Sequence, residues 1–146
     1  MKKKRISIIM FGLYMTVLLR ITVFRSSFSL YSLFQKGTLN LTLFADYLPL
    51  LYQGRWLRFL YLFVGNIVWF IPFGAFWYGI GIRRDMRRIL LLGFLFSLTI
   101  ETLQFVFGTG VTELDDLILN TFGVWVGAKL CQICLKIFGL SQEKGR

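Results

Sequence analysis

The sequence predicts an all-α integral membrane protein, a bundle of four spanning helices that forms one domain over residues 1–146. Three observations predict it. The chain is 56% hydrophobic and only 16% charged, four apolar windows are long enough to cross a bilayer, and the basic residues gather beside those windows. This composition excludes an ordinary small soluble domain.

The four apolar windows give the helices in chain order, since a spanning helix needs about 20 apolar residues. They are Ile6–Phe24, Phe59–Ile82, Ile89–Phe107 and Leu117–Leu135, and the last helix is expected to begin at about residue 115. The second window has no charged residue. Each of the others has one, namely Arg20, Glu101 or Lys129, which a span tolerates if the charge reaches the interface or finds a partner.

The net charge of +10 reflects membrane topology and not a nucleic-acid partner, because the basic residues form patches next to the windows. The patches are Lys2, Lys3, Lys4 and Arg5 before the first window, Arg83, Arg84, Arg87 and Arg88 between the second and third, and Lys136, Lys144 and Arg146 after the last. The loop Gly108–Leu114 has no Lys or Arg. By the positive-inside rule, both termini are expected in the cytoplasm.

The connection Arg25–Arg58 is long and carries four basic residues in or beside it, which are Arg25, Lys36, Arg55 and Arg58. Within it, Leu39–Tyr52 is apolar but too short to span, and it contains Asp46 and Pro49. This segment is either re-entrant or interfacial, or it is a loop packed over the bundle. The sequence leaves both interpretations open.

Two other motifs have ordinary explanations. The first window has the basic start of a signal peptide but no small-x-small cleavage site, so we expect it to be retained. Cys131 and Cys134 form a C-x-x-C on an apolar helix in a chain without His, which favours packing residues over a redox or zinc site.

Polar residues gather on both sides of the loop Gly108–Leu114. Two stripes follow from helical spacing: Ser97, Glu101 and Gln104 before the loop, and Asp116, Asn120, Gly123 and Gly127 after it. The short loop makes the two helices antiparallel neighbours, and the Gly-x-x-x-Gly pair is expected to let their backbones approach closely.

Asn66, Glu101 and Asn120 are expected at one depth, about 9–12 Å below the outer ends of their helices at 1.5 Å per residue. Carboxylate and amide groups that converge from three helices predict a ligand-binding or catalytic pocket open to the outside. An intramembrane carboxylate is costly, so Glu101, Asp116 and Asn120 favour a functional role.

Structural roles stay open for the other polar residues. Ser97 and Gln104 are explained equally well by interhelical hydrogen bonds, worth about 0.6 kcal/mol each on average. Asp115 and Asp116 also suit the first turn of the last helix, where the helix dipole favours carboxylates.

Three motifs together resemble the VanZ-like family of small bacterial membrane proteins, over about residues 6–135. They are Asn66 with Ile71-Pro72-Phe73-Gly74, then Ser97-x-x-x-Glu101-x-x-Gln104, then Glu113-Leu114-Asp115-Asp116-Leu117-Ile118-Leu119-Asn120-Thr121-x-Gly123. The family's Asn-Leu-x-Pro-Phe element is similar to residues 40–44, with Leu43 in place of proline. The arginine that often precedes the acidic cluster is replaced by Gly110-Val111-Thr112. If that arginine holds an anionic group in relatives, this chain must use another base or a different ligand.

The resemblance implies a multi-pass protein of the bacterial cytoplasmic membrane, associated in some members with low-level resistance to glycopeptide antibiotics, teicoplanin in particular. Our first hypothesis is a non-enzymatic envelope factor, without a cofactor, that binds a membrane lipid or a lipid-linked cell-wall intermediate or alters its display. Its pocket residues are Asn66, Ser97, Glu101, Gln104, Asp115, Asp116 and Asn120, and the basic side chains of Arg20, Arg25, Arg55 and Arg58 suit a lipid phosphate.

Two alternatives remain. One is a membrane enzyme acting on a polyprenyl-linked phosphate, with Glu101 as general base and Asp115 and Asp116 holding Mg²⁺ together with it, since oxygen ligands suit that ion. The other is a structural membrane protein whose polar groups only join helices.

Overall fold

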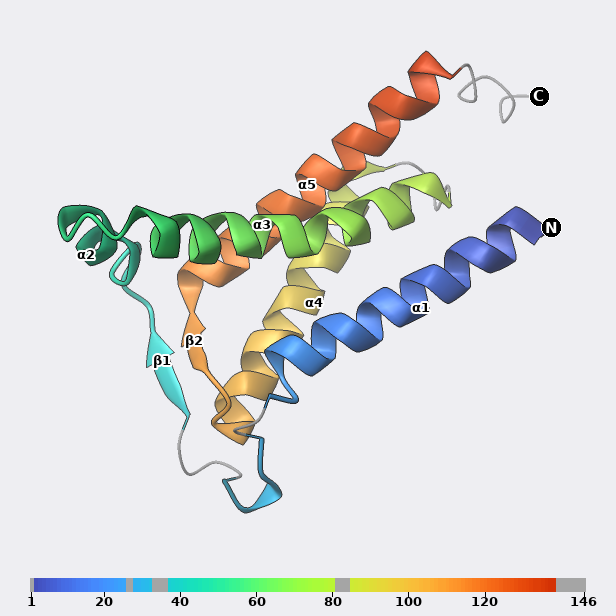
Figure 1. The fold of residues 1–146 in the computed structure, drawn as a ribbon. Coiled ribbons are helices and arrows are strands. Elements are labelled where there is room, and N and C mark those ends of the chain that lie inside the picture. Colours follow the sequence, from blue (N-terminus) through green and yellow to red (C-terminus); the bar gives the residue numbers. More distant parts are fainter. Residues whose placement is uncertain (1, 26–27, 33–36, 81–84, 139–146) are drawn as a thin grey trace.

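The computed structural model describes residues 2–25, 28–32, 37–80 and 85–138 (Figure 1). In chain order the elements are α1 (Lys2–Thr22), a 3-10 turn (Leu30–Ser32), β1 (Thr38–Asn40), α2 (Tyr47–Tyr52), α3 (Trp56–Gly79), α4 (Met86–Phe107), β2 (Val111–Glu113) and α5 (Leu114–Ile137). Of the residues used to predict the topology, Lys36, Ile82, Arg83, Arg84, Lys144 and Arg146 lie outside the described residues.

The prediction of four spanning helices is confirmed, because α1, α3, α4 and α5 are long and apolar enough to cross a membrane. Their ends differ from the apolar windows by a few residues, since a helix continues into charged or aromatic residues until something stops it. Asp85 caps the start of α4 by accepting a hydrogen bond from the backbone N–H of Arg87 at 3.0 Å. Gly108 ends α4 in the left-handed conformation, with φ 59°.

The start of α1 and the end of α5 lie at the same end of the bundle (Figure 1). The long first connection and the connection between α4 and α5 lie at the opposite end, called the loop end below. Consequently α3 and α5 both begin at the loop end and run parallel, and α4 runs antiparallel to both.

The closest backbone approach joins α5 to α3. A Cβ atom added to Gly123 or Gly127 would lie within 3.0 Å of the backbone of Ile67 or Ile71, closer than real Cβ atoms come to other atoms. The expectation that these glycines pack against the preceding helix, α4, was therefore wrong. A short loop makes α4 a neighbour of α5, but it does not decide which neighbour the small residues face.

Other glycines complete these contacts. On α3, Gly74 faces the backbone of Val124 in α5, so both parallel helices contribute small residues to the α3–α5 seam. On α4, Gly93 faces the side chain of the same valine. Val124 is fully buried between the three helices.

Residues of the first connection cover the loop end. β1 pairs with β2 in parallel, with Thr38 opposite Val111 and Asn40 opposite Glu113. α2 has only six residues and packs against α3, and its Tyr47 and Leu50 are buried. This arrangement agrees with a loop packed over the bundle.

Candidate functional site

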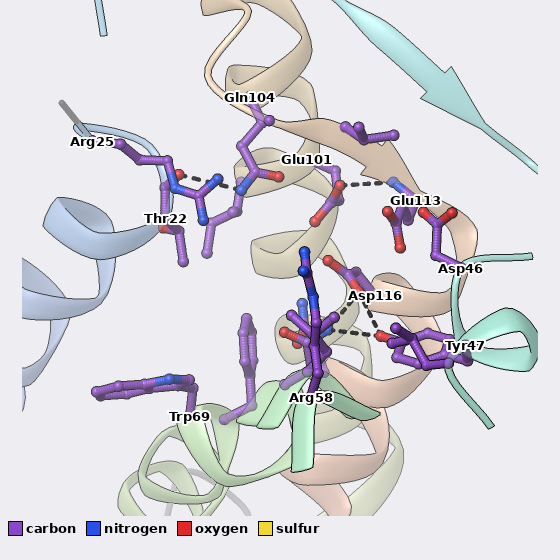
Figure 2. A pocket seen from close by; sticks show the side chains of 18 of the residues that line it. Thr22, Arg25, Asp46, Tyr47, Arg58, Trp69, Glu101, Gln104, Glu113 and Asp116 are labelled. Carbon is purple, nitrogen blue, oxygen red and sulfur yellow. Dashed lines mark hydrogen bonds between the residues drawn. The ribbon is translucent and has the colours of Figure 1, made fainter. Parts of the chain in front are cut away.

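A cavity of about 620 Å³ lies at the loop end, between the ends of α1 and α4, the starts of α3 and α5, and the covering segments α2 and β2 (Figure 2). Five of the sequence-predicted site residues line it: Asn66, Glu101, Gln104, Asp116 and Asn120. The other two, Ser97 and Asp115, are buried outside this lining.

Asp116 at the start of α5 connects three elements. Its Oδ1 accepts a hydrogen bond from the side-chain amide of Asn66 on α3. The same oxygen accepts the Tyr47 hydroxyl of α2 at 3.4 Å. Burial raises the pKa of Tyr47 far above its ordinary value, and the nearby Asp116 raises it further. The hydroxyl therefore stays protonated and acts as the hydrogen-bond donor to Asp116.

Glu101 holds α4 against β2. Its side chain is 2% exposed, and its Oε2 accepts the backbone N–H of Glu113 at 3.1 Å. Its backbone carbonyl accepts the Thr112 hydroxyl at 2.9 Å. One carboxyl oxygen of Glu101 is therefore used by the fold, and Figure 2 shows the other turned toward the cavity.

Glu113 and Asp46 form a pair of carboxyl groups at the edge of the cavity, near Asp116 (Figure 2). Burial, together with a hydrogen bond to Asp46, raises the pKa of Glu113 to about 8. At neutral pH the Glu113 side chain is therefore mostly protonated and adds little negative charge to the cavity.

The amide side chains of Asn120 and Gln104 each use one end to join two helices. Asn120 Nδ2 donates to Ser97 Oγ at 2.9 Å, and Gln104 Nε2 donates to the Thr22 carbonyl at 3.2 Å. Their oxygens, Asn120 Oδ1 and Gln104 Oε1, are buried and have no donor among the described residues. Buried acceptors in proteins normally accept a hydrogen bond, so both oxygens can accept one from a bound ligand.

Asp115 is 3% exposed and binds the covering loop. Its Oδ2 accepts the backbone N–H of Phe44 at 2.8 Å. Phe44 has φ 57°, an uncommon value for a residue other than glycine, and Asn40 Oδ1 accepts the N–H of Thr42 at 3.1 Å to close the turn before it. The segment that resembles the family's Asn-Leu-x-Pro-Phe element thus places the backbone N–H of Phe44 where it can donate to Asp115.

The two adjacent carboxylates of α5 therefore face different neighbours. Asp115 points to Phe44, whereas Asp116 points to Asn66 and Tyr47. Within the described ranges, no three Asp, Glu, Cys or His side chains are grouped so that they could hold a metal ion. The alternative Mg²⁺ site of Glu101, Asp115 and Asp116 is not assembled in this arrangement.

Three arginines line the cavity: Arg25 beyond the end of α1, and Arg55 and Arg58 at the start of α3. Figure 2 shows that Arg25 and Arg58 approach from different sides. In the part of the chain that the structure describes, no ion pair joins them to a carboxylate, and the pair that does occur, Arg88 with Asp85 at 3.3 Å, lies at the other end of α4. Their charges are therefore available to an anionic ligand.

Arg25 also lies beside Gly110, in the segment before the acidic cluster that lacks the family's arginine. Its Nη1 donates to the carbonyl of Thr109 at 3.2 Å, beside Gly110. Arg20, the fourth basic residue expected to suit a phosphate, bonds to the carbonyl of Phe24 and does not line the cavity.

Comparison with known proteins identifies the family of this chain. The model of the VanZ/LLP1 family matches residues 11–135. The chain belongs to the VanZ/LLP1 family. It is also 30% identical over 138 residues to Protein VanZ of Enterococcus faecium, and the match covers 90% of this chain and 73% of that protein. No solved structure matches the chain significantly.

Family membership confirms the resemblance expressed by the three sequence motifs. The matched region contains every residue that lines the cavity, from Leu18 to Asn120. Together with the four long apolar helices, it identifies the chain as a VanZ-like, multi-pass membrane protein.

Proposed function

We propose that this protein binds the anionic headgroup of a membrane lipid or a lipid-linked cell-wall intermediate in the loop-end cavity. The observation that carries the proposal is the set of three cavity arginines, none of which is paired with a carboxylate among the described residues. Guanidinium groups bind phosphate through two parallel hydrogen bonds, so they suit this class of ligand. A volume of about 620 Å³ is within the usual size of small-molecule sites.

In the cell, this binding lowers susceptibility to glycopeptide antibiotics of the teicoplanin type. The predicted topology places the loop end on the outer face of the cytoplasmic membrane, where such antibiotics act on cell-wall intermediates. A protein that holds the headgroup, or changes how it is displayed, weakens antibiotic capture without a chemical step. The family match and the similarity to Protein VanZ support this role.

A purely structural role for the polar residues is less well supported, because side chains that only join helices pack against one another and leave no cavity. Here Gln104 and Asn120 each join two helices through nitrogen and keep an unpartnered oxygen. Their polar groups exceed what helix association needs.

Thermal denaturation of purified protein in neutral detergent tests the proposal. Phosphatidylmethanol, whose headgroup is a simple phosphodiester, should raise the melting temperature, because a ligand that binds only the folded state stabilises it. Arg58→Gln should abolish the shift. Arg88→Gln is the matched control, since Arg88 lies at the opposite end of α4. Equal shifts in the wild type and Arg58→Gln would contradict headgroup binding in this cavity.

A further inference from the structure

The lining of the cavity contains hydrogen-bond acceptors as well as arginines. We call the side chains of Gln104 and Asn120 its acceptor wall. Gln104 is 8% exposed and Asn120 is 4% exposed, and an oxygen of each is buried without a donor among the described residues. Their nitrogens already donate to Thr22 and Ser97, which fixes the oxygens as the unsatisfied ends. Both residues line the cavity, and two unsatisfied acceptors in its lining indicate a ligand that brings hydrogen-bond donors.

Carboxylates extend this acceptor wall. Glu101 turns one oxygen toward the cavity beside Gln104, and Asp116 lies below it (Figure 2). A simple phosphodiester has no hydrogen-bond donor for this wall. Such a ligand would satisfy the arginines but leave the acceptors unpaired.

We propose that the cavity recognises a phosphate headgroup that carries hydroxyl groups next to the phosphate, as a sugar phosphate or a polyol phosphate does. The proposal rests on the proposed function and names the class of its ligand. Arg25 and Arg58 bind the phosphate, and Gln104 and Asn120 accept hydrogen bonds from the hydroxyl groups. A site built around hydroxyl donors discriminates strongly against an analogue that lacks them, because its acceptors then stay buried and unpaired.

Two matched pairs of ligands test this. The soluble pair is methyl phosphate and glucose 1-phosphate, both phosphate monoesters, which differ in the hydroxyl-bearing ring. The lipid pair is phosphatidylmethanol and phosphatidylinositol, both phosphodiesters, which differ in the same way. Affinity is measured by titration of the full chain, with the soluble pair added to detergent and the lipid pair added in nanodiscs of otherwise neutral lipid.

We expect the hydroxyl-bearing member of a pair to bind at least about tenfold more tightly, which corresponds to one additional hydrogen bond. Gln104→Met and Asn120→Leu should each reduce the ratio of the two affinities within a pair. Arg58→Gln should weaken both members. Thr99→Val on the same helix as Gln104 is the control, because the Thr99 hydroxyl bonds only to its own helix, at Leu95.

The outcomes separate the two proposals. Equal affinity within each pair would overturn the hydroxyl-bearing class and leave headgroup binding intact. Tighter binding of phosphatidylethanolamine than of phosphatidylinositol would also overturn it, since the donor would then be an ammonium group. Absence of binding to every phosphate would overturn the proposed function itself. Tighter binding of phosphatidylinositol than of glucose 1-phosphate identifies a lipid-linked ligand, and the reverse order identifies a free sugar phosphate.

Discussion

The side chain of Asn66 on α3 donates a hydrogen bond to the carboxylate of Asp116 on α5, across two helices that run parallel. The glycine seam between these helices fixes the register at which they meet, because Gly123 lies against Ile67 and Gly127 lies against Ile71. A shift of either helix would separate Asn66 from Asp116. Close packing of small residues in the bundle therefore positions one polar pair of the cavity.

Replacement of Gly127 tests this dependence. A Cβ at Gly127 would clash with the carbonyl of Ile71, so Gly127→Ala should destabilise the protein by about 1–3 kcal/mol and lower its abundance in membranes. Gly65→Ala on α3 is the matched control, because no atom lies within 4 Å of a Cβ there. It should leave the melting temperature unchanged or raise it. Equal melting temperatures for the two variants would contradict the seam.

The sequence predicted the four helices because each presents a long apolar window, a signal that depends only on local residues. It failed on the partner of Gly123 and Gly127. Loop length identifies α4 as a neighbour of α5, but the closest approach depends on small residues that two helices share. Gly74, in the Ile71-Pro72-Phe73-Gly74 motif of α3, is one of these shared small residues, since it faces the backbone of Val124 in α5.

The site was predictable where it consists of polar residues inside apolar windows, as with Glu101 and Asn120. Tyr47 and Phe44 had no such signal. Their contacts with α5 join residues 69 and 71 positions apart, and they depend on the pairing of β1 with β2. A three-residue strand leaves almost no pattern in a sequence, so this pairing could not be inferred from it.

The orientation of the bundle is tested by reporters. The basic clusters predict that both termini face the cytoplasm, so a reporter fused after Arg146 should be cytoplasmic and one inserted at Thr109 should be external. The same experiment decides which side of the membrane the cavity faces. An external reporter at the C-terminus would place the cavity on the cytoplasmic side and remove the proposed route to antibiotic tolerance.

The affinity for an anionic ligand and the stability of the protein should both depend on pH through Glu113, whose pKa is raised to about 8. Below this pH the side chain is neutral, and above it a negative charge appears at the edge of the cavity. Affinity for phosphatidylmethanol, which keeps one charge throughout, should therefore fall as the pH rises from 7 to 9. Because the raised pKa favours the protonated form in the folded state, the stability that Glu113 contributes should be full below about pH 4.5 and should be lost as the pH rises to about 8. Glu113→Gln should flatten both profiles.

Metal binding distinguishes the enzyme hypothesis from non-enzymatic headgroup binding. Since Asp115 and Asp116 face different neighbours, millimolar Mg²⁺, Mn²⁺ or Ca²⁺ should not raise the melting temperature of the purified protein. A shift that Asp116→Asn abolishes would contradict this expectation. It would favour the enzyme that acts on a polyprenyl-linked phosphate.

Glu101 gives the most direct test of function. In Glu101→Gln, the side-chain oxygen can still accept the backbone N–H of Glu113, so α4 stays attached to β2 and the variant should accumulate at near wild-type levels. What it loses is the acceptor that faces the cavity, because the other end of the Gln amide is an NH2 group, which only donates. We therefore expect overexpression of the wild type to reduce susceptibility to a lipoglycopeptide, and overexpression of the variant to leave susceptibility unchanged.

Two further variants make this result specific. Asn120→Ala should behave like Glu101→Gln, because it removes an unpartnered buried acceptor from a residue that lines the cavity. Thr102→Val should keep the full phenotype, since the Thr102 hydroxyl bonds to the carbonyl of Leu98 in its own helix. Susceptibility is measured together with the amount of protein in the membrane. If Glu101→Gln keeps the full phenotype, or fails to accumulate, Glu101 acts only as the tie between α4 and β2, and recognition must depend on the arginines alone.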